Sequence, residues 1–324
     1  MKLIFAADIV RHGDRSSIYY IPEISAAWKS EDMGKLTLKG EKDAIKSGEE
    51  FNQYFIATNS LLPYSFQPDT IYIRSTDFQR TKETARRIMR GIYPSQSETI
   101  PINTVPREED LLLLGFLYAY GKEMKSLTRS RHCYVPKASK QIIKEVDLEL
   151  KKINNKFGTN LNESSDIVKV ADVIRVAKIH DRALLKKMSD EEVEQVFRVA
   201  KLLFLDIFKS PQAACAGAGA LLKQILEKMD GKIRNEVSFK YMLFSGHDTN
   251  LLCMMSLLGL SLEEVPYLSN IRFELFKQDA AKFFVKISYL NKTAKIYSEE
   301  YCLFYKFKSF VDYRLKKKCE AVLK

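Results

Sequence analysis

Long apolar runs, paired cysteine motifs and histidines are all scarce in this chain of 324 residues. No segment approaches the roughly 18 consecutive apolar residues that a membrane-spanning helix needs, so we expect no membrane span. The five cysteines form no Cys-x-x-Cys pair, which argues against a structural zinc site, and their odd number leaves at least one thiol unpaired. Internal repeats and low-complexity segments are also missing, which leaves an ordinary globular chain.

The composition and charge narrow the class of partner. Hydrophobic residues make up 46% of the chain and charged residues 29%, as in globular proteins, and the length suits one large domain or two of ordinary size. A net charge of +11 favours anionic partners. Because the lysines are spread over many expected helices and form no stripe with interleaved aromatics, we expect small anions and no nucleic acid.

Strands and helices alternate in the N-terminal third. An uninterrupted apolar run over residues 3–10 is typical of a strand covered on both faces, and β-branched and aromatic residues predict another strand at 69–73. Thr37 is placed to cap a helix, and a second helix is predicted over residues 77–93, ending before Pro94. This order favours a mostly parallel sheet with helices on its faces.

Strand patterns vanish in the middle of the chain. Four helices are predicted there, over residues 140–157, 165–179, 189–208 and 216–229. Ser189 and Glu192 form a capping box at the start of the third helix, and Gly231 is placed to end the fourth. This stretch is expected to form a helical insertion.

Strand patterns return in the last third. We expect a strand at 239–244, a helix at 251–258 that ends at Gly259, and an antiparallel hairpin at 271–275 and 283–287. The whole pattern predicts an α/β fold with a mostly parallel central sheet flanked by helices and an inserted, mainly helical cap domain. We place the α/β core at residues 1–115 and 232–324, and the cap at 116–231.

Arg-His-Gly-Asp-Arg, at residues 11–15, directly follows the first predicted strand. It sets the imidazole of His12 between two guanidinium groups. A neutral imidazole is a competent nucleophile, and planar guanidinium groups are suited to gripping a tetrahedral phosphate through paired, charge-assisted hydrogen bonds. The alternative interpretation is a solvated basic turn after a strand.

Polar side chains follow three of the predicted strands. Arg11 and His12 follow the first, Arg74 the second, and His247 with Asp248 the third. Ligands of open α/β sheets bind at the carboxyl ends of the strands, so we expect these residues to converge. In phosphoryl transfer His12 would be the nucleophile, His247 a further donor to phosphate and Asp248 the acid for the leaving oxygen. For Gly-His-Asp, ordinary helix capping is the alternative, and it is compatible with an anion site.

These motifs, in this order, resemble those of the histidine acid phosphatases, the branch of the histidine phosphatase superfamily that includes prostatic and lysosomal acid phosphatases and bacterial phytases. The matching segments are Val-Arg-His-Gly-Asp-Arg-Ser at 10–16, Leu-Thr-Leu-Lys-Gly at 36–40, Ile-Arg-Ser-Thr-Asp-Phe-Gln-Arg-Thr at 73–81, Ser-Gly-His-Asp-Thr-Asn at 245–250 and Arg-Phe-Glu-Leu at 272–275. Ser17 stands where the family usually has proline, and Asp43 replaces a common glutamine.

The resemblance implies a fold and a mechanism. It implies an α/β domain with a helical cap, a phosphohistidine intermediate on His12, and Asp248 as the group that protonates the leaving oxygen, with no metal or cofactor. The phosphate-binding residues that it implies are Arg11, Arg15, Arg74 and His247.

The resemblance also implies a disulfide pairing and a cellular compartment for the protein. Arg131-His132-Cys133 resembles the family's Arg-Cys-Pro cap segment, whose cysteine pairs near the C-terminus, which implies Cys319 or Cys302 as the partner of Cys133. Cys215 and Cys253 lie in apolar helical segments and are expected to be small buried residues. The family works mostly outside the reducing cytosol, and no signal peptide precedes the first strand. We therefore expect a periplasmic or secreted protein with its leader removed.

The expected substrate is a small phosphomonoester, with broad specificity that includes nucleoside monophosphates. Candidate substrate-rim residues, which would sandwich a base or phenyl ring or else pack cap against core, are Ile18, Tyr19, Tyr118 and Tyr120. The oligomeric state stays open, with a homodimer among the alternatives.

Other classes of function are weighed against this one. A phytase-like inositol phosphate phosphatase is an alternative, since His-Asp-Thr-Asn also occurs in bacterial phytases, and a non-catalytic phospholigand-binding protein is another. A cysteine phosphatase is rejected, because the arginine needed six positions after Cys133 is replaced by Ser139. The phosphoglycerate mutase branch typically has glutamate where Asp14 stands.

Overall fold

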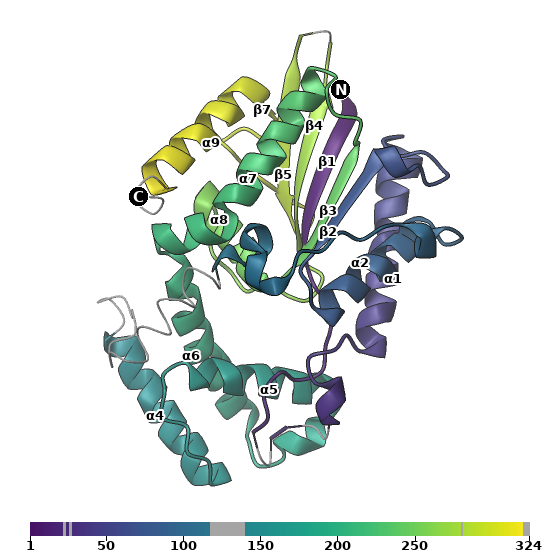
Figure 1. Cartoon of the computed structure of the whole chain (residues 1–324). Coiled ribbons are helices and arrows are strands. Elements are labelled where there is room, and N and C mark those ends of the chain that lie inside the picture. The colour runs from purple at the N-terminus through teal and green to yellow at the C-terminus, as the bar shows by residue number, and fades with distance from the viewer. Residues whose placement is uncertain (22–23, 26–27, 117–139, 280, 320–324) are drawn as a thin grey trace. The chain divides into compact units, whose positions relative to one another are not determined.

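A mixed sheet forms the centre of the fold (Figure 1). Within residues 1–21, 24–25, 28–116, 140–279 and 281–319, which the computed structural model describes, seven strands join this sheet. Their order is β2 (Ile71–Ser75), β3 (Tyr241–Gly246), β1 (Lys2–Arg11), β4 (Asn270–Lys277), β5 (Phe283–Tyr289) and β6 (Lys292–Ala294), with β7 (Cys302–Leu303) also paired to β5. β2, β3 and β1 run parallel to one another. The pairs β1–β4, β4–β5, β5–β6 and β5–β7 are antiparallel. The predicted α/β class with helices flanking a central sheet is confirmed; the sheet is mixed because the predicted hairpin extends it beyond β1.

Two groups of residues make most of their contacts internally. The first unit contains Met1–Asp14, Leu36–Glu123 and Pro211–Lys324, and the second contains Arg15–Lys35 and Met124–Ser210. The sheet lies entirely in the first unit.

Helices cover both faces of the sheet in the first unit (Figure 1). They are α1 (Leu38–Asn52), α2 (Gln79–Ile92), α7 (Pro211–Ile233), α8 (Asp248–Leu258) and α9 (Phe304–Cys319), with a π-helical turn at Gln53–Thr58 and a short helix at 111–116. Ala6 and Val10 of β1 belong to the apolar cluster with α1 and α2. Ile9, which points to the opposite face, is also fully buried. This two-sided burial explains why residues 3–10 form an uninterrupted apolar run.

Local sequence explains the helix ends and the closest helix contact. The Thr37 hydroxyl accepts a hydrogen bond from the N–H of Gly40, which confirms the predicted cap of α1. Gly259, with φ 78°, ends α8 as predicted. Gly48 of α1 and Gly91 of α2 face each other so closely that a Cβ on Gly48 would lie 2.1 Å from the carbonyl oxygen of Ile88. Only glycine permits this approach.

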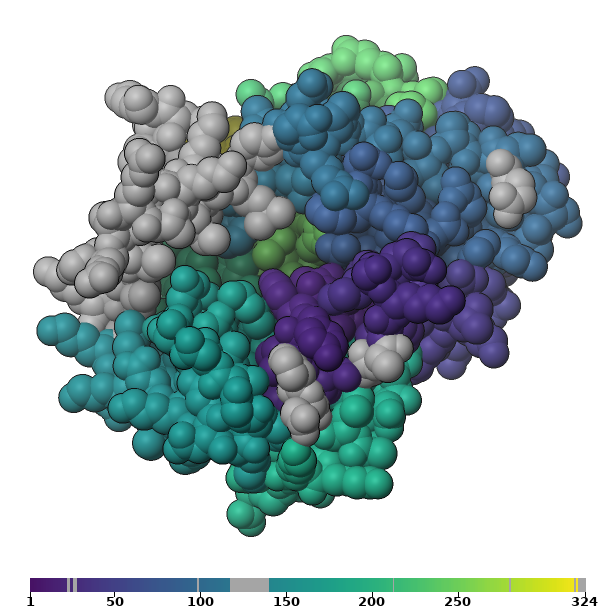
Figure 2. Space-filling model, turned by 60° about the horizontal axis from the view of Figure 1, so that its bottom comes forward, coloured from purple at the N-terminus to yellow at the C-terminus, as the bar shows by residue number. Residues whose placement is uncertain are grey.

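The second unit is helical. It contains α4 (Lys140–Phe157), α5 (Asp166–His180) and α6 (Asp190–Phe208), and the predicted Ser189/Glu192 capping box at α6 is confirmed. Ile21 and Ile24 of the N-terminal segment are buried in the apolar core of these helices. The purple surface of this segment lies against the teal helical surface in Figure 2. Short 3₁₀ turns complete the described elements, at Ser30–Asp32, Pro68–Thr70, Ser97–Thr99, Arg107–Glu109 and Arg182–Leu185.

The two units differ from the expected core and cap at two places. α7 belongs to the first unit because it packs against α8 and α9. It also runs through Gly231 to Ile233, so the predicted stop at Gly231 is wrong. Residues 15–35 group with the helical unit because their isoleucines enter its core.

One disulfide joins α7 to α9, between Cys215 and Cys319. Cys215 is buried as expected, and the sequence did not predict its bond. The expectation that Cys133 pairs with Cys319 or Cys302 is wrong, because Cys319 is bonded to Cys215 and Cys302 is a buried free thiol. Cys133 itself lies outside the described residues. Cys253 is a buried free thiol as expected, and burial raises the pKa of its thiol.

Two features are missing from the part of the chain that the structure describes. None of its helices has both the length and the apolar character needed to cross a bilayer. No group of three or more His, Cys, Asp and Glu residues is arranged there to hold a metal ion.

The disulfide predicts a measurable stabilisation of the first unit. Cys215 and Cys319 are 104 residues apart, so the bond removes much conformational freedom from the unfolded chain. Replacing Cys319→Ser is expected to lower the free energy of unfolding by about 2–5 kcal/mol, measured by chemical denaturation. Reductant should destabilise the unsubstituted protein and leave the Cys319→Ser variant unchanged. Cys302→Ala serves as the control, since it removes a free thiol and should keep the response to reductant. An equal response to reductant in all three proteins would contradict the bond.

Candidate active site

The three parallel strands end side by side in the first unit. The backbone N–H of His12, just beyond β1, donates to the carbonyl of Gly246 at the end of β3, at 2.9 Å. The backbone N–H of Thr76, just beyond β2, donates to the carbonyl of Ser245 at 3.2 Å. The sheet therefore delivers the polar residues that follow its strands to one edge, as Figure 1 shows for β1, β2 and β3.

His12 is buried and held in one tautomer. Its Nδ1 lies 2.9 Å from the carbonyl oxygen of Gly13, and its side chain is almost fully buried. Because a carbonyl oxygen can only accept a hydrogen bond, Nδ1 carries the proton of the neutral ring. The lone pair is then on Nε2, which is the nitrogen that can act as a nucleophile.

His247 lies next to His12. The two ring centroids are 5.5 Å apart in an edge-to-face arrangement. Nε2 of His247 is 3.1 Å from the hydroxyl oxygen of Thr76, and its ring also meets the ring of Phe78 edge to face. The backbone N–H of His247 donates to Asn250 Oδ1 at 2.8 Å, which fixes His247 at the N-terminus of α8. His247 is therefore the N-cap residue of α8, immediately before Asp248, and its ring lies beside that of His12, as expected.

Arg11 is held from three sides. Its Nη1 donates to the carbonyl of Val265, and its Nη2 lies 3.1 Å from Oδ2 of Asp248. The ring of Tyr267 lies under the guanidinium, with its centroid 4.3 Å from the central carbon, and this ring is also 5.7 Å from that of His12. A buried cation thus has a carboxylate, a carbonyl and an aromatic face as partners.

Arg74 has a more deeply buried partner. Its Nη2 lies 2.8 Å from Oδ1 of Asp110, and both side chains are almost completely buried. Asp110 Oδ1 also accepts the backbone N–H of Leu113 at 3.1 Å. Nη1 of Arg74 donates to the carbonyl of Ser75, close to the Thr76 backbone that follows β2. The guanidinium is consequently fixed at the strand end.

Arg15 belongs to the second unit. Its guanidinium makes two hydrogen bonds to Asp172, at 2.8 and 3.2 Å, in a two-pronged pair on α5. The predicted site residues that the structure brings together are therefore those of the first unit, namely Arg11, His12, Arg74, His247 and Asp248.

The expected rim residues are only partly described. Ile18 and Tyr19 lie in the second unit, each 36% exposed. Tyr118 and Tyr120 lie outside the described residues.

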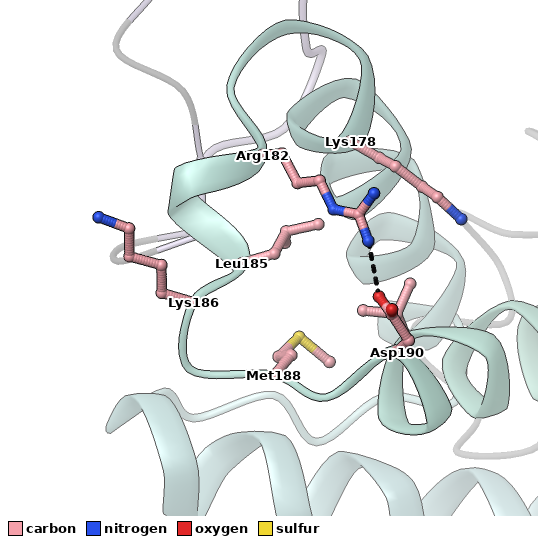
Figure 3. Close-up of a pocket in the computed structure, with 7 residues that line it drawn as sticks. Lys178, Arg182, Leu185, Lys186, Met188 and Asp190 are labelled. Atoms are coloured by element: carbon pink, nitrogen blue, oxygen red, sulfur yellow. Dashed lines mark hydrogen bonds and ion pairs between the residues drawn. The ribbon is translucent and has the colours of Figure 1, made fainter.

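A basic hollow of about 290 Å³ lies in the second unit (Figure 3). Lys178, Arg182 and Lys186 surround it, and Arg182 pairs with Asp190 at 2.9 Å. Arg182 and Asp190 are both mainly exposed to solvent, where such pairs contribute little. This hollow differs in kind from the buried charges around His12.

The family of the chain follows from its match to a family model. The model of the histidine phosphatase superfamily (branch 2) matches residues 2–215 and 191–290. These matches span most of the chain, and the chain belongs to this branch of the superfamily.

Relatives and solved structures agree with this assignment. Lysosomal acid phosphatase of Xenopus laevis is 26% identical over 315 residues, covering 91% of this chain and 71% of the relative. Human lysosomal acid phosphatase is 26% identical over 314 residues (91% and 72%), and human prostatic acid phosphatase 24% over 309 residues (90% and 78%). The phytase from Citrobacter braakii superimposes with a TM-score of 0.72 at 16% identity, covering 97% of this chain and 98% of that one. This last likeness shows a shared fold.

Several residues around the site were not found from the sequence. Asp110 is one acid in a run of three, Glu108 to Asp110, with nothing to single it out. Tyr267 follows Pro266 before a strand, a position that predicts no contact with Arg11. Each becomes important only through tertiary contacts with residues far away in the chain.

The buried Arg74–Asp110 pair predicts a large loss of stability when broken. Asp110→Asn would leave the Arg74 guanidinium buried without its counter-charge, and we expect the free energy of unfolding to fall by about 3–5 kcal/mol. Asp77→Asn is the matched control, since it breaks the exposed pair with Lys82 and is expected to cost at most about 1 kcal/mol. Denaturant titration of both variants measures the difference.

Added inorganic phosphate should restore more stability to Asp110→Asn than it adds to the unsubstituted protein, because the anion would replace the missing charge. Equal losses in Asp110→Asn and Asp77→Asn would contradict this account of the pair.

Proposed function

We propose that this chain is an acid phosphatase that hydrolyses small phosphomonoesters through a phosphohistidine intermediate on His12. The observation that carries the proposal is the tautomer of His12, with Nδ1 held by the Gly13 carbonyl and Nε2 left as the nucleophilic nitrogen. Membership of the histidine phosphatase superfamily and similarity to lysosomal and prostatic acid phosphatases support the same activity.

In the first step Nε2 of His12 attacks phosphorus, and the bond from phosphorus to the ester oxygen breaks. Arg11, Arg74 and a protonated His247 stabilise the negative charge on the phosphate oxygens. Arg15 is a fourth phosphate-binding residue in this proposal. Its assignment rests on the match to the family motif at residues 10–16.

Asp248 gives its proton to the departing ester oxygen. It lies against Arg11 at 3.1 Å and is the more exposed of the two carboxylates that pair with the site arginines. A phosphate ester that binds Arg11 competes with Asp248 for the same guanidinium. The neighbouring anion then favours the protonated, neutral form of Asp248, which is the form that can act as an acid.

In the second step water attacks the phosphohistidine. The bond from Nε2 to phosphorus breaks, Asp248 takes a proton from the water, and inorganic phosphate leaves. The cycle uses no metal or cofactor, because the two histidines, the arginines and Asp248 account for nucleophile, charge stabilisation and proton transfer.

The proposed substrates are small monoesters, nucleoside monophosphates included. Ile18 and Tyr19 keep part of their apolar surface accessible, as stacking on a base or phenyl ring requires. A phytase-like inositol phosphate phosphatase is the second candidate, which the shared fold with the Citrobacter braakii phytase and the His-Asp-Thr-Asn segment at 247–250 favour. The third is a non-catalytic phospholigand-binding protein.

We also propose that the protein works outside the reducing cytosol, in the periplasm or as a secreted protein. The Cys215–Cys319 disulfide supports an oxidising compartment, since such bonds are rare in the cytosol of most organisms.

Removing the nucleophile should abolish turnover. We expect His12→Ala to lower the steady-state release of p-nitrophenol from p-nitrophenyl phosphate at acidic pH by about 10³-fold or more, because the covalent route is lost. His180→Ala is the matched control, since this histidine lies in the helical unit against Trp28 and should keep full activity. Unchanged turnover in His12→Ala would rule out the proposed nucleophile. Phosphate binding without any turnover in the unsubstituted protein would favour the non-catalytic alternative.

Removing the acid should affect substrates unequally. Asp248→Asn is expected to slow hydrolysis of glycerol phosphate by about 10²–10⁴-fold, because an alkoxide needs protonation as it leaves. Hydrolysis of p-nitrophenyl phosphate should slow far less, since its phenoxide is a stable leaving group. The ratio of kcat/KM for the two substrates measures the effect, and an unchanged ratio would show that Asp248 is not the acid.

A further inference from the structure

Residues 265–269, which lead into β4, lie against the end of β1 in the first unit. Because β4 runs antiparallel to β1 with Asn270 opposite Val10, the residues just before β4 meet those just after Val10. The carbonyl of Ser269 accepts the backbone N–H of Arg11 at 2.9 Å. We call these five residues the β4-entry segment.

A tight turn within this segment fixes the direction of Tyr267. The N–H of Ser269 donates to the carbonyl of Pro266 at 3.1 Å, which leaves Tyr267 and Leu268 as the two central residues of the turn. Leu268 has φ 62°, a left-handed conformation that glycine adopts far more readily. Other residues keep such a conformation where surrounding contacts determine the path of the chain, and here the Leu268 N–H donates to the carbonyl of His12 at 3.4 Å. The turn is thus held against the end of β1.

The ring of Tyr267 covers the flat face of the Arg11 guanidinium, with its centroid 4.3 Å from the central carbon. Nη1 of this guanidinium donates to the carbonyl of Val265, and its Nε has no hydrogen-bond partner among the described residues. Nη2 lies 3.1 Å from Asp248. The orientation of the guanidinium therefore depends on three partners, which are the ring, the Val265 carbonyl and Asp248.

Of these three partners, only Asp248 carries a charge. In the proposed mechanism a phosphate ester competes with Asp248 for Nη2 of Arg11. A phosphate oxygen binds the N–H edge of a guanidinium, whereas an aromatic ring holds its flat face, so both can be bound at once. A neutral ring also stabilises the cation without cancelling the charge that attracts the phosphate. Tyr267 therefore suits an arginine that exchanges its anionic partner.

Arg74 is held in a different way. Its Nη2 pairs with Asp110, whose side chain is completely buried, so a fixed negative charge balances this guanidinium. Arg11 instead has neutral partners on its face and at Nη1. When a phosphate takes the place of Asp248, these neutral partners remain to hold the Arg11 guanidinium in position.

We propose that Tyr267 is a positioning residue for phosphate binding, because its ring holds the Arg11 guanidinium with Nη2 directed at the phosphate. This inference rests on the proposed function, in which Arg11 binds the phosphate group. Without the ring the guanidinium would occupy other orientations, and the affinity for phosphate would fall with the fraction of molecules in the binding orientation. The ring also lies 5.7 Å from that of His12, so one side chain borders both the phosphate-binding cation and the nucleophile.

Three substitutions separate the ring of Tyr267 from its hydroxyl and its bulk. Tyr267→Leu and Tyr267→Met remove the ring, and Tyr267→Phe keeps it. Binding of inorganic phosphate to the whole protein at acidic pH is measured by isothermal titration calorimetry. We expect the two variants without the ring to bind phosphate about fivefold to tenfold more weakly, as loss of a cation–π contact implies, and Tyr267→Phe to stay within about twofold of the unsubstituted protein.

Two variants without the ring are compared, so the test stands if one of them fails to fold. Equal losses in Tyr267→Phe and Tyr267→Leu would show that the ring is not the group that matters and would overturn the proposal. Unchanged phosphate affinity in the variants without the ring would overturn it as well.

Phe310→Leu is the matched control. Phe310 is buried in α9, which contributes no residue to the candidate site, and its ring centroid lies 5.1 Å from the guanidinium carbon of Arg314. The substitution removes the same kind of contact in the same unit, and the variant should bind phosphate as the unsubstituted protein does. A loss as large as that of Tyr267→Leu would point to general destabilisation and contradict the proposed role.

A double-mutant cycle shows whether Tyr267 acts through Arg11. In an Arg11→Met background, Tyr267→Leu should cause no further loss of phosphate affinity, because the group that the ring holds is gone. A loss of the same size in both backgrounds would show a structural role independent of Arg11 and would overturn the proposal.

The binding measurement does not depend on turnover. Phosphate binding with the expected effect of Tyr267, in a protein that hydrolyses no ester, would refute the phosphatase activity and support the role of Tyr267. No phosphate binding by the unsubstituted protein would overturn both.

Discussion

The guanidinium groups of Arg11 and Arg74 are charged and buried, and each lies against a carboxylate. Taking an ion out of water costs several kcal/mol, which is on the order of the net free energy of unfolding of a small domain. An unpaired arginine at either position would therefore unfold the strand ends around it. Asp248 and Asp110 supply the missing charge at 3.1 and 2.8 Å. A phosphate group carries the same sign of charge and the same kind of acceptor oxygens. The charges that stabilise these buried arginines are therefore of the kind that the proposed phosphate ester would also supply.

The two carboxylates differ in how freely they can be exchanged. Asp110 is completely buried, and one of its oxygens also accepts the Leu113 N–H, so it stays with Arg74. Asp248, at the first position of α8, also accepts a backbone N–H, from Thr249, but it is 29% exposed, so the proposed phosphate ester can compete with it for Arg11. In the proposed mechanism this difference in burial assigns proton transfer to Asp248 and leaves Asp110 to fix Arg74.

The sequence predicts the parts of the site that depend on strand order and misses the parts that depend on packing. The apolar run before Arg11, the capping pattern at Thr37 and the Gly-His-Asp segment before an apolar helix are local, and each indicated its element correctly. The partners Asp110 and Tyr267 come from loops whose paths no local pattern determines. The Cys215–Cys319 bond was missed for the same reason, since apolar helical surroundings predict burial equally well for a free and a paired cysteine.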